Sequence, residues 1–262
     1  LSGQPLPADS VTGTVRPVPE VKAVAQPYTS SGGAGPEADQ AFYTRVSERL
    51  RHRNRAVTSW DYERLILQEF PEVHKAKCLP VGSFDDPAAA DEVRIIVIPD
   101  IRGKLPFDPF APKVPADVLR AIEAHLQQHA PPFARVVVRN PRYLQLKLRF
   151  SVRLRPEGNA GFYLQSLHDE LQRYLAPWAY NDAADIVFGG RINTNLIVNF
   201  LEERPYVDFV AGLKLFASAD GSEFHEVEGP EAGIDQLPGG GPDVILVSAR
   251  AHQIDLIGAA RY

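Results

Sequence analysis

The sequence predicts an α+β fold, with a helix pair, then two small α+β sandwich modules, then a short β-rich tail. Segments with the 3.6-residue period of helices alternate along the chain with short apolar runs typical of strands. One segment, residues 144–154, alternates apolar and polar residues with the strict period of a half-buried strand. The chain of 262 residues, with 44% hydrophobic and 23% charged residues, is long enough for one large or two small domains.

Residues 1–36 are expected to form an extended Pro/Gly-rich arm. They contain six prolines and almost no periodic apolar pattern. The isolated Val and Leu residues cannot offset the entropy of ordering such a segment, although they could dock on a neighbouring protein.

Residues 37–79 are expected to form a helix pair that leads into a strand. In the first helix, Phe42, Val46 and Leu50 recur every four residues and form one narrow apolar stripe. Pro36 suits the first helical position, because its missing N–H would be unpaired there anyway. Asn54 is expected to end this helix.

The second helix carries a start signal. Thr58 precedes Asp61 by three residues, which is a variant of the capping box, and Val57 is placed to pack against Tyr62 as a staple. The expected buried face consists of Tyr62, Leu65, Ile66 and Phe70. A strand is expected near residues 75–79, where Cys78 is interpreted as a small buried hydrophobe.

Residues 80–140 are assigned to the first α+β module. Its elements are a strand at residues 93–98, a proline-rich loop to Pro115, a helix at residues 116–129 and a strand at residues 134–139.

Residues 141–217 are assigned to the second module. The alternating strand carries Leu144, Leu146, Leu148, Phe150, Val152 and Leu154. A helix is expected at about residues 162–175, and Asn193 is expected to cap another helix. Two strands are expected near residues 206–210 and 213–216.

Residues 218–262 are expected to form an acidic, β-rich tail, and they differ in charge from the helix pair. Residues 219–262 hold eight acidic and two basic residues, a net charge of −6, whereas residues 45–64 hold six arginines and three acidic residues, a net charge of +3. The overall charge of −5 therefore hides an uneven distribution. The basic and acidic regions could attract each other or different partners.

Several strings resemble one protein family. RVSERLRHRNRAVTSWDYERLILQEFPEV at 45–73 is similar to the signature of baseplate J-like proteins, the wedge components of contractile phage tails and related injection systems. PPFARVVVRNPRYLQLKLRFSVRL, LAPWAYNDAADIVFGGRINTNLIVNFLEERPYVDFV and ILVSARAHQIDLI resemble later parts of such proteins in the same order. The resemblance covers about residues 28–258. Because the family is usually longer, and the chain lacks methionine, it implies the C-terminal portion of a larger polypeptide.

The resemblance implies a structural protein, not an enzyme, with no cofactor and no metal. Its expected role is a baseplate wedge component that joins subunits around the hub, with other wedge subunits, copies of itself, and hub and sheath proteins as partners. Assembly is expected in the cytoplasm, and the product is a virion-like or extracellular injection particle. No nucleic acid or membrane span is expected, since no apolar run approaches twenty residues.

An arginine cluster is the candidate interface. The residues proposed for it are Arg45, Arg49, Arg51, Arg53, Arg55 and Trp60, with a core role as the alternative for Trp60. Arginine is enriched in protein interfaces because its planar guanidinium pairs with carboxylates through two hydrogen bonds. A solvated helix face is the competing interpretation, and phosphate binding by the arginines is a third.

Two other functions remain open. The β-rich acidic tail could belong to a ligand- or glycan-binding appendage of a tail-like particle. His125 and His129 have a spacing compatible with metal binding in a hydrolase, but no third ligand is evident. The aspartate pairs Asp85/Asp86 and Asp182/Asp185 are interpreted as turn formers.

Overall fold

The structure is a computed structural model that describes residues 6–16, 18–30, 37–79, 92–101, 108–156, 159–181 and 184–258. Within these residues, five α-helices and several sheets confirm the mixed α+β class. The chain divides into two compact units, residues 1–53 and 54–262. The predictions for Pro36, Asp85, Asp86 and Asp182 lie outside the described residues.

The described residues of the arm fold back on themselves and form neither a helix nor a strand. The N–H of Asp9 donates to the carbonyl of Gln26 at 2.8 Å, and the N–H of Ser30 donates to the carbonyl of Leu6 at 2.9 Å. These bonds join its two extended ends as in an open hairpin. Most of its described apolar side chains are exposed, with Tyr28 at 81%.

Helix α1, Asp39–His52, begins after Ala38, which makes no side-chain cap. It ends two residues before the predicted Asn54, because Arg53 and Asn54 both take positive φ angles. The expected apolar stripe is not buried: Phe42 is 44% and Leu50 is 71% exposed. The four-residue spacing correctly predicted a helix. Such a spacing does not show which surface, if any, covers the apolar stripe.

Helix α2, Ser59–Glu69, has the predicted capping box. Thr58 Oγ1 accepts from the N–H of Asp61 at 3.3 Å, and the Asp61 carboxylate accepts from the N–H of Thr58 at 2.8 Å. The predicted staple is weak, because Val57 is 65% exposed.

The first sheet consists of strands β1 (Val73–Leu79), β2 (Glu92–Pro99) and β3 (Arg135–Arg139), in the order β1-β2-β3. Strands β1 and β2 are antiparallel, and β3 is parallel to β2 because helix α3, Ala116–His129, forms the crossover between them. The bounds of α3 agree with the prediction. Its Ile122 and Leu126 pack in one core with Ile95 of β2.

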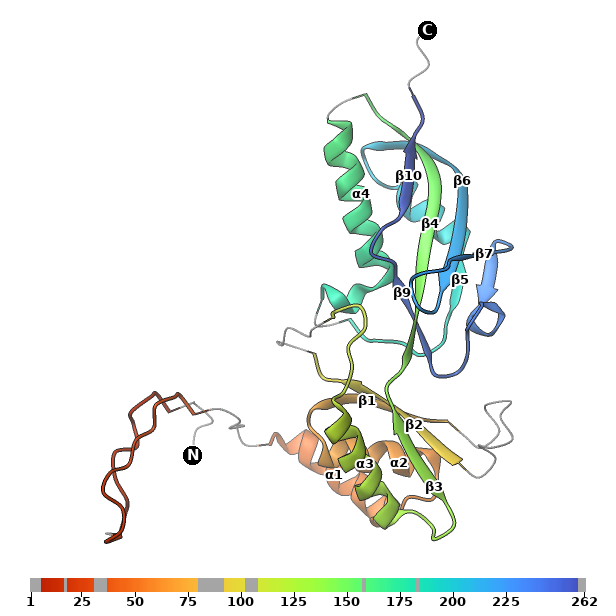
Figure 1. The fold of residues 1–262 in the computed structure, drawn as a ribbon. Helices are drawn as coiled ribbons and strands as arrows, with labels where there is room; N and C mark the ends of the chain where they lie inside the picture. Colours follow the sequence, from red (N-terminus) through yellow and green to blue (C-terminus); the bar gives the residue numbers. More distant parts are fainter. Residues whose placement is uncertain are drawn as a thin grey trace. The chain divides into compact units, whose positions relative to one another are not determined.

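The second sheet is built on strand β4, Arg142–Leu154, whose predicted alternation is confirmed by its burial. Strand β6, Val207–Ser218, pairs with β4 antiparallel, and β7, His225–Val227, pairs with β6. Strands β9, Val244–Ser248, and β10, Gln253–Leu256, both pair with β4 in parallel (Figure 1). Thus strands from the acidic segment 218–262 lie on both sides of β4.

One strand prediction was wrong. The segments 206–210 and 213–216 belong to the single strand β6, which continues through Gly212 at a φ of 64°. Glycine adopts this conformation without a steric penalty, so the ladder shifts its register there without ending.

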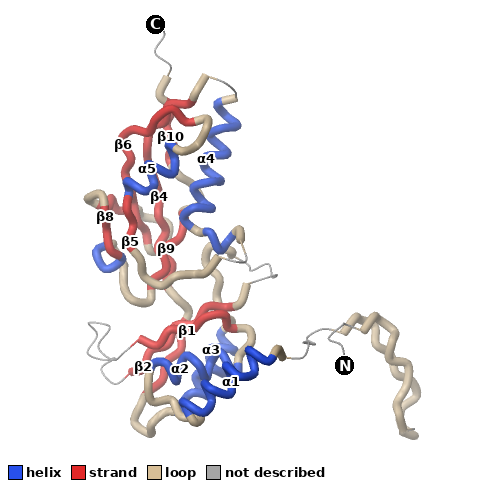
Figure 2. The backbone as a smooth tube through the Cα atoms, turned by 180° about the vertical axis from the view of Figure 1, so that it is seen from behind, coloured by secondary structure: helices blue, strands red, loops and turns tan. Residues whose placement is uncertain are grey.

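Helices α4, Ala160–Leu175, and α5, Thr194–Glu202, pack against the second sheet. Asn193 caps α5 as predicted, accepting from the N–H of Asn195 at 2.9 Å. Helix α5 lies behind the strands in Figure 1 and in front of them in Figure 2, so it covers one face. Strands β5, Arg191–Asn193, and β8, Glu231–Gly233, form a small third sheet, and the short 3₁₀ helices η2 and η3 span Pro177–Ala179 and Ile234–Gln236.

Candidate interaction surface

Helix α1 carries three of the six predicted interface residues, and a fourth, Arg53, is its C-cap residue. Arg45 makes a two-bond ion pair with Glu37, at 3.0 and 2.8 Å, and its guanidinium lies 5.4 Å from the ring centroid of Phe42. The hydrogen bond between the pair raises the pKa of Arg45 and lowers the pKa of Glu37. Arg45 is therefore already engaged, which weakens it as a free contact residue.

Arg49, Arg51 and Arg53 are exposed at the C-terminal end of α1. Cations there complement the negative end of the helix dipole, which is the local structural reason for basic residues in a last turn. All three side chains reach the surface at this end of the helix.

The other two predicted residues lie in the second compact unit. Arg55 is exposed, whereas Trp60 is half-buried in the first turn of α2. The guanidinium of Arg64 lies 5.8 Å from the Trp60 ring centroid. Part of the Trp60 ring is therefore covered by a side chain of its own helix. The predicted cluster is divided between residues 1–53 and 54–262.

The aromatic content of α1 was not predicted as part of the surface. Phe42 and Tyr43 are 44% and 66% exposed, and their rings meet edge to face with centroids 5.7 Å apart. Leu50 adds an exposed aliphatic side chain two turns further along. Exposed aromatic residues beside arginines are the composition that protein interfaces favour.

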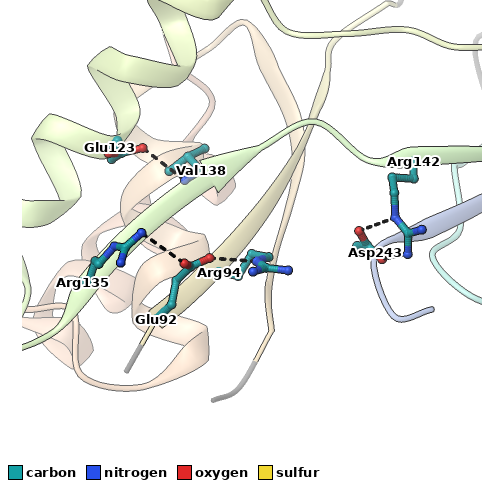
Figure 3. Close-up of polar contacts among 7 residues, drawn as sticks. All are labelled: Glu92, Arg94, Glu123, Arg135, Val138, Arg142 and Asp243. Carbon is teal, nitrogen blue, oxygen red and sulfur yellow. Dashed lines mark hydrogen bonds and ion pairs between the residues drawn. The ribbon is translucent and has the colours of Figure 1, made fainter. Parts of the chain in front are cut away.

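A buried carboxylate at the start of β2 was also missed. Glu92 accepts from Arg94 at 2.9 Å and lies 3.6 Å from Arg135 of the adjacent strand β3 (Figure 3). A charge that opens an apolar strand was the only signal in the sequence. The triad joins two neighbouring strands, so its role is structural.

A second ion pair, between the exposed Arg142 and the buried Asp243, joins the start of β4 to the loop before β9 (Figure 3). Two parallel bonds connect the side chains, at 2.8 and 2.7 Å, and Arg142 also donates to the carbonyl of Gly239 at 3.2 Å. Burial opposes ionisation of Asp243, but the bonds and charge of Arg142 outweigh it, and the pKa of Asp243 is lowered. This bidentate pair fixes the glycine-rich loop.

The histidine pair of α3 is a packing feature. The rings of His125 and His129 lie 4.6 Å apart, and His129 Nδ1 lies 2.8 Å from the carbonyl oxygen of His125. Desolvation, followed by the charge of His129, lowers the pKa of His125, whose ring packs edge to face on Phe70. No cluster of three or more His, Cys, Asp and Glu side chains with metal-binding geometry occurs in the described part of the chain.

A serine–histidine pair that the sequence did not suggest lies between β9 and β10. His252 Nδ1 accepts from the N–H of Leu148 at 3.2 Å, and Nε2 lies 3.1 Å from Ser248 Oγ. Since Nδ1 is the acceptor, Nε2 carries the proton and cannot act as a base toward Ser248. The pair completes the β4 ladder where β9 has ended and β10 has not begun.

Two single residues also receive structural roles. Cys78 is buried, as predicted, and desolvation raises its pKa to about 11, which disfavours the reactive thiolate. Asp185, predicted as a turn former, accepts from Lys75 of β1 at 2.7 Å, and this bond lowers its pKa.

A shallow pocket of about 330 Å³ lies beside the start of β4. Its lining includes Lys113, Arg142, Tyr143 and Gln145. Tyr143 Oη donates to the carbonyl of Pro112 at 2.6 Å, so this hydroxyl is already bonded within the chain. No helix in the described ranges is long and apolar enough to cross a membrane.

Comparisons with known proteins identify the family. The family model "Baseplate protein PVC11-like" matches residues 3–233. A chain in the structure "Cryo-EM structure of the anti-feeding prophage (AFP) baseplate, 6-fold symmetrised" is similar in fold, with a TM-score of 0.62 and 23% identity over 94% of this chain. The chain spans 49% of the length of that relative. No curated protein matches. The chain belongs to the PVC11-like baseplate protein family.

Proposed function

We propose that this PVC11-like baseplate protein is a non-enzymatic wedge component that joins neighbouring subunits around the hub of a contractile injection particle. The family match supports a structural role in a baseplate. The observation that supports a subunit contact is helix α1, where Phe42, Tyr43 and Leu50 are exposed beside basic residues. The wedge assignment, assembly in the cytoplasm, and contacts with hub and sheath proteins form part of the proposal.

The physical basis of the contact is the burial of α1. Covering a fully exposed aromatic or leucine side chain contributes about 1.5–3 kcal/mol. Helix α1 presents three such side chains that are partly exposed, so each would contribute a part of that amount. Arginines around them would pair with carboxylates of the partner and select its orientation. The body, residues 54–262, would act as a rigid module that changes its arrangement with neighbours when the particle contracts.

The test is a charge reversal on α1. Arg49→Glu, Arg51→Glu and Arg53→Glu are combined in the gene that encodes this chain, and sheathed particles are counted by negative-stain microscopy. We expect loss of particles, while circular dichroism and thermal melting of the purified variant show a folded chain. The matched control reverses three exposed arginines elsewhere, Arg120, Arg139 and Arg191, and should leave particle numbers unchanged.

Normal particles from the α1 variant would contradict the proposed contact. In that case the appendage interpretation becomes the stronger one. Glycan-array binding by the purified chain, weakened by Lys113→Ala in the pocket beside β4, would then be its direct support.

A further inference from the structure

The free edges of the first sheet are closed by helix side chains. On β1, Glu63 of α2 accepts from the N–H of Cys78 at 3.0 Å. On β3, two side chains of α3 do the same: Gln127 accepts from Val136 at 3.2 Å and Glu123 from Val138 at 3.4 Å (Figure 3). An edge whose N–H groups are already bonded is a poor template for another strand.

In the second sheet, the part of β6 that does not pair with β7 has its edge closed in the same way. Glu202 of α5 accepts from the N–H of Val210 at 3.1 Å. At three separate edges, therefore, a glutamate from a neighbouring helix occupies a backbone donor. A strand edge that lacks such a side-chain acceptor therefore differs from the other edges and is open to pairing with another strand.

Strand β10 is such an edge. The N–H of Ile257 donates to the carbonyl of Val152 at 2.9 Å, and among the described strands β10 pairs only with β4. Since alternate residues direct their backbone groups to opposite edges, the N–H and C=O groups of Ile254 and Leu256 point away from β4. Within the described ranges no hydrogen bond occupies these groups, and the Leu256 side chain is 47% exposed.

The arm contains a segment with the complementary property. Residues 21–26 have the sequence VKAVAQ, lie between Pro19 and Pro27, and contain no proline. The Val21 N–H and the Gln26 carbonyl are bonded within the arm, but the backbone groups of residues 22–25 have no hydrogen bond to other described residues. The segment is assigned neither helix nor strand and is mostly exposed.

We propose that β10 of one copy accepts residues 21–26 of the arm of a neighbouring copy as an added strand. The side chains fit this pairing. In an extended strand, Val21, Ala23 and Ala25 share one face, as Ile254 and Leu256 do on β10. Lys22 lies on the opposite face, where it meets the exposed Asp255 of β10. The main-chain bonds supply affinity, and the alternating side chains supply register.

The test uses proline to remove a single backbone donor from either strand. Leu256→Pro removes an outward N–H of β10 without breaking a bond to β4, and Val24→Pro disrupts the arm segment. Leu256→Thr and Val24→Thr are the matched controls, because both keep the N–H. Self-association of each full chain is measured by sedimentation velocity over a concentration series.

The wild-type chain and both threonine variants should self-associate, and each proline variant should associate at least about tenfold more weakly, a difference of about 1.4 kcal/mol. A mixture of the two proline variants should form a one-to-one complex, since one still offers an arm and the other an edge. Should Leu256→Pro melt at a lower temperature than Leu256→Thr, Val24→Pro carries the test alone, because the arm lies outside the compact unit that contains β10.

A wild-type chain that stays monomeric throughout the series overturns the proposal. So does a Val24→Pro variant that associates like the wild type, or a mixture that forms no complex. Pairing between the arm and β10 does not depend on the proposed contact of α1. The α1 charge reversal should leave arm-dependent association unchanged, so the two tests fail separately.

Discussion

Residues 54–262 and residues 1–53 differ in where their apolar side chains lie. The second unit contains all three clusters of buried apolar residues found in the described chain, whereas in the first unit His52 is the only buried described residue. This amount of buried apolar surface offsets the entropy lost when the body becomes ordered. The described residues of the arm and α1 bury no comparable apolar surface. The difference is the basis of the proposal that the first unit contacts other proteins.

The helix ends follow the same division. Helix α2 at the start of the body has a complete capping box, while α1 begins at Ala38 without a side-chain cap. A helix whose ends are not satisfied by its own residues gains more from a partner. The sequence of α1 is thus consistent with a helix that is completed on assembly.

The largest effect should come from truncating the same residue type in each unit. Leu148 of β4 is fully buried, and Leu50 of α1 is 71% exposed. Leu148→Ala should lower the free energy of unfolding by about 2–5 kcal/mol, because it removes apolar contacts and leaves a cavity. Leu50→Ala should change it by less than about 0.5 kcal/mol, as is usual for exposed positions. Urea denaturation of the two variants makes the comparison.

A loss above about 1 kcal/mol for Leu50→Ala would contradict the division. It would mean that α1 contributes to folding within the isolated chain. Leu50→Met keeps the apolar volume and serves as the control for the substitution itself.

The sequence predicted the elements that follow from local pattern. The alternation of Leu144 to Leu154 and the period of the α3 residues each correspond to a single element in the structure. Pairing between distant segments was not predictable, because strands β9 and β10 meet β4 only through contacts about a hundred residues apart. The exposure of the apolar stripe of α1 was not predictable for a related reason: a period identifies a face but not the surface that covers it.

The candidate site was predicted less completely. Arginines mark a possible surface by composition, and Arg49, Arg51 and Arg53 are exposed as an interface requires. Composition cannot show that Arg45 already pairs with Glu37. The open edge of β10 was also beyond sequence reasoning, since a free backbone group leaves no trace in residue type.

A second, smaller effect should appear when the pH is lowered, and it belongs to the body alone. Burial, with the nearby charges of His168 and Lys147, lowers the pKa of His252 to about 3. In the unfolded chain the pKa of this histidine is about 6.5, so the unfolded chain is protonated first as the pH falls. The contribution of His252 to stability is therefore fully present above about pH 6.5 and is lost as the pH falls toward about 3. Between pH 7 and pH 5 the contribution lost is about 2 kcal/mol.

This loss has a geometric cause, because a doubly protonated His252 cannot accept the N–H of Leu148. Urea denaturation of the wild type and His252→Asn at both pH values measures it. The difference in stability between the two proteins should shrink by about 2 kcal/mol at pH 5. A difference between the two proteins that is the same at pH 7 and pH 5 would refute the assignment.

The smallest effect concerns the two helix caps, where the units are most directly comparable. Thr58→Ala removes the hydroxyl that accepts the N–H of Asp61, and should lower the free energy of unfolding of the body by about 1 kcal/mol. Ala38→Ser supplies the cap that α1 lacks. It should raise helix content by circular dichroism while leaving the urea midpoint of the body unchanged, since α1 does not contribute to the buried core. A midpoint that rises with Ala38→Ser would instead show that α1 and the body fold as one cooperative unit, which removes the premise that α1 is ordered by a partner.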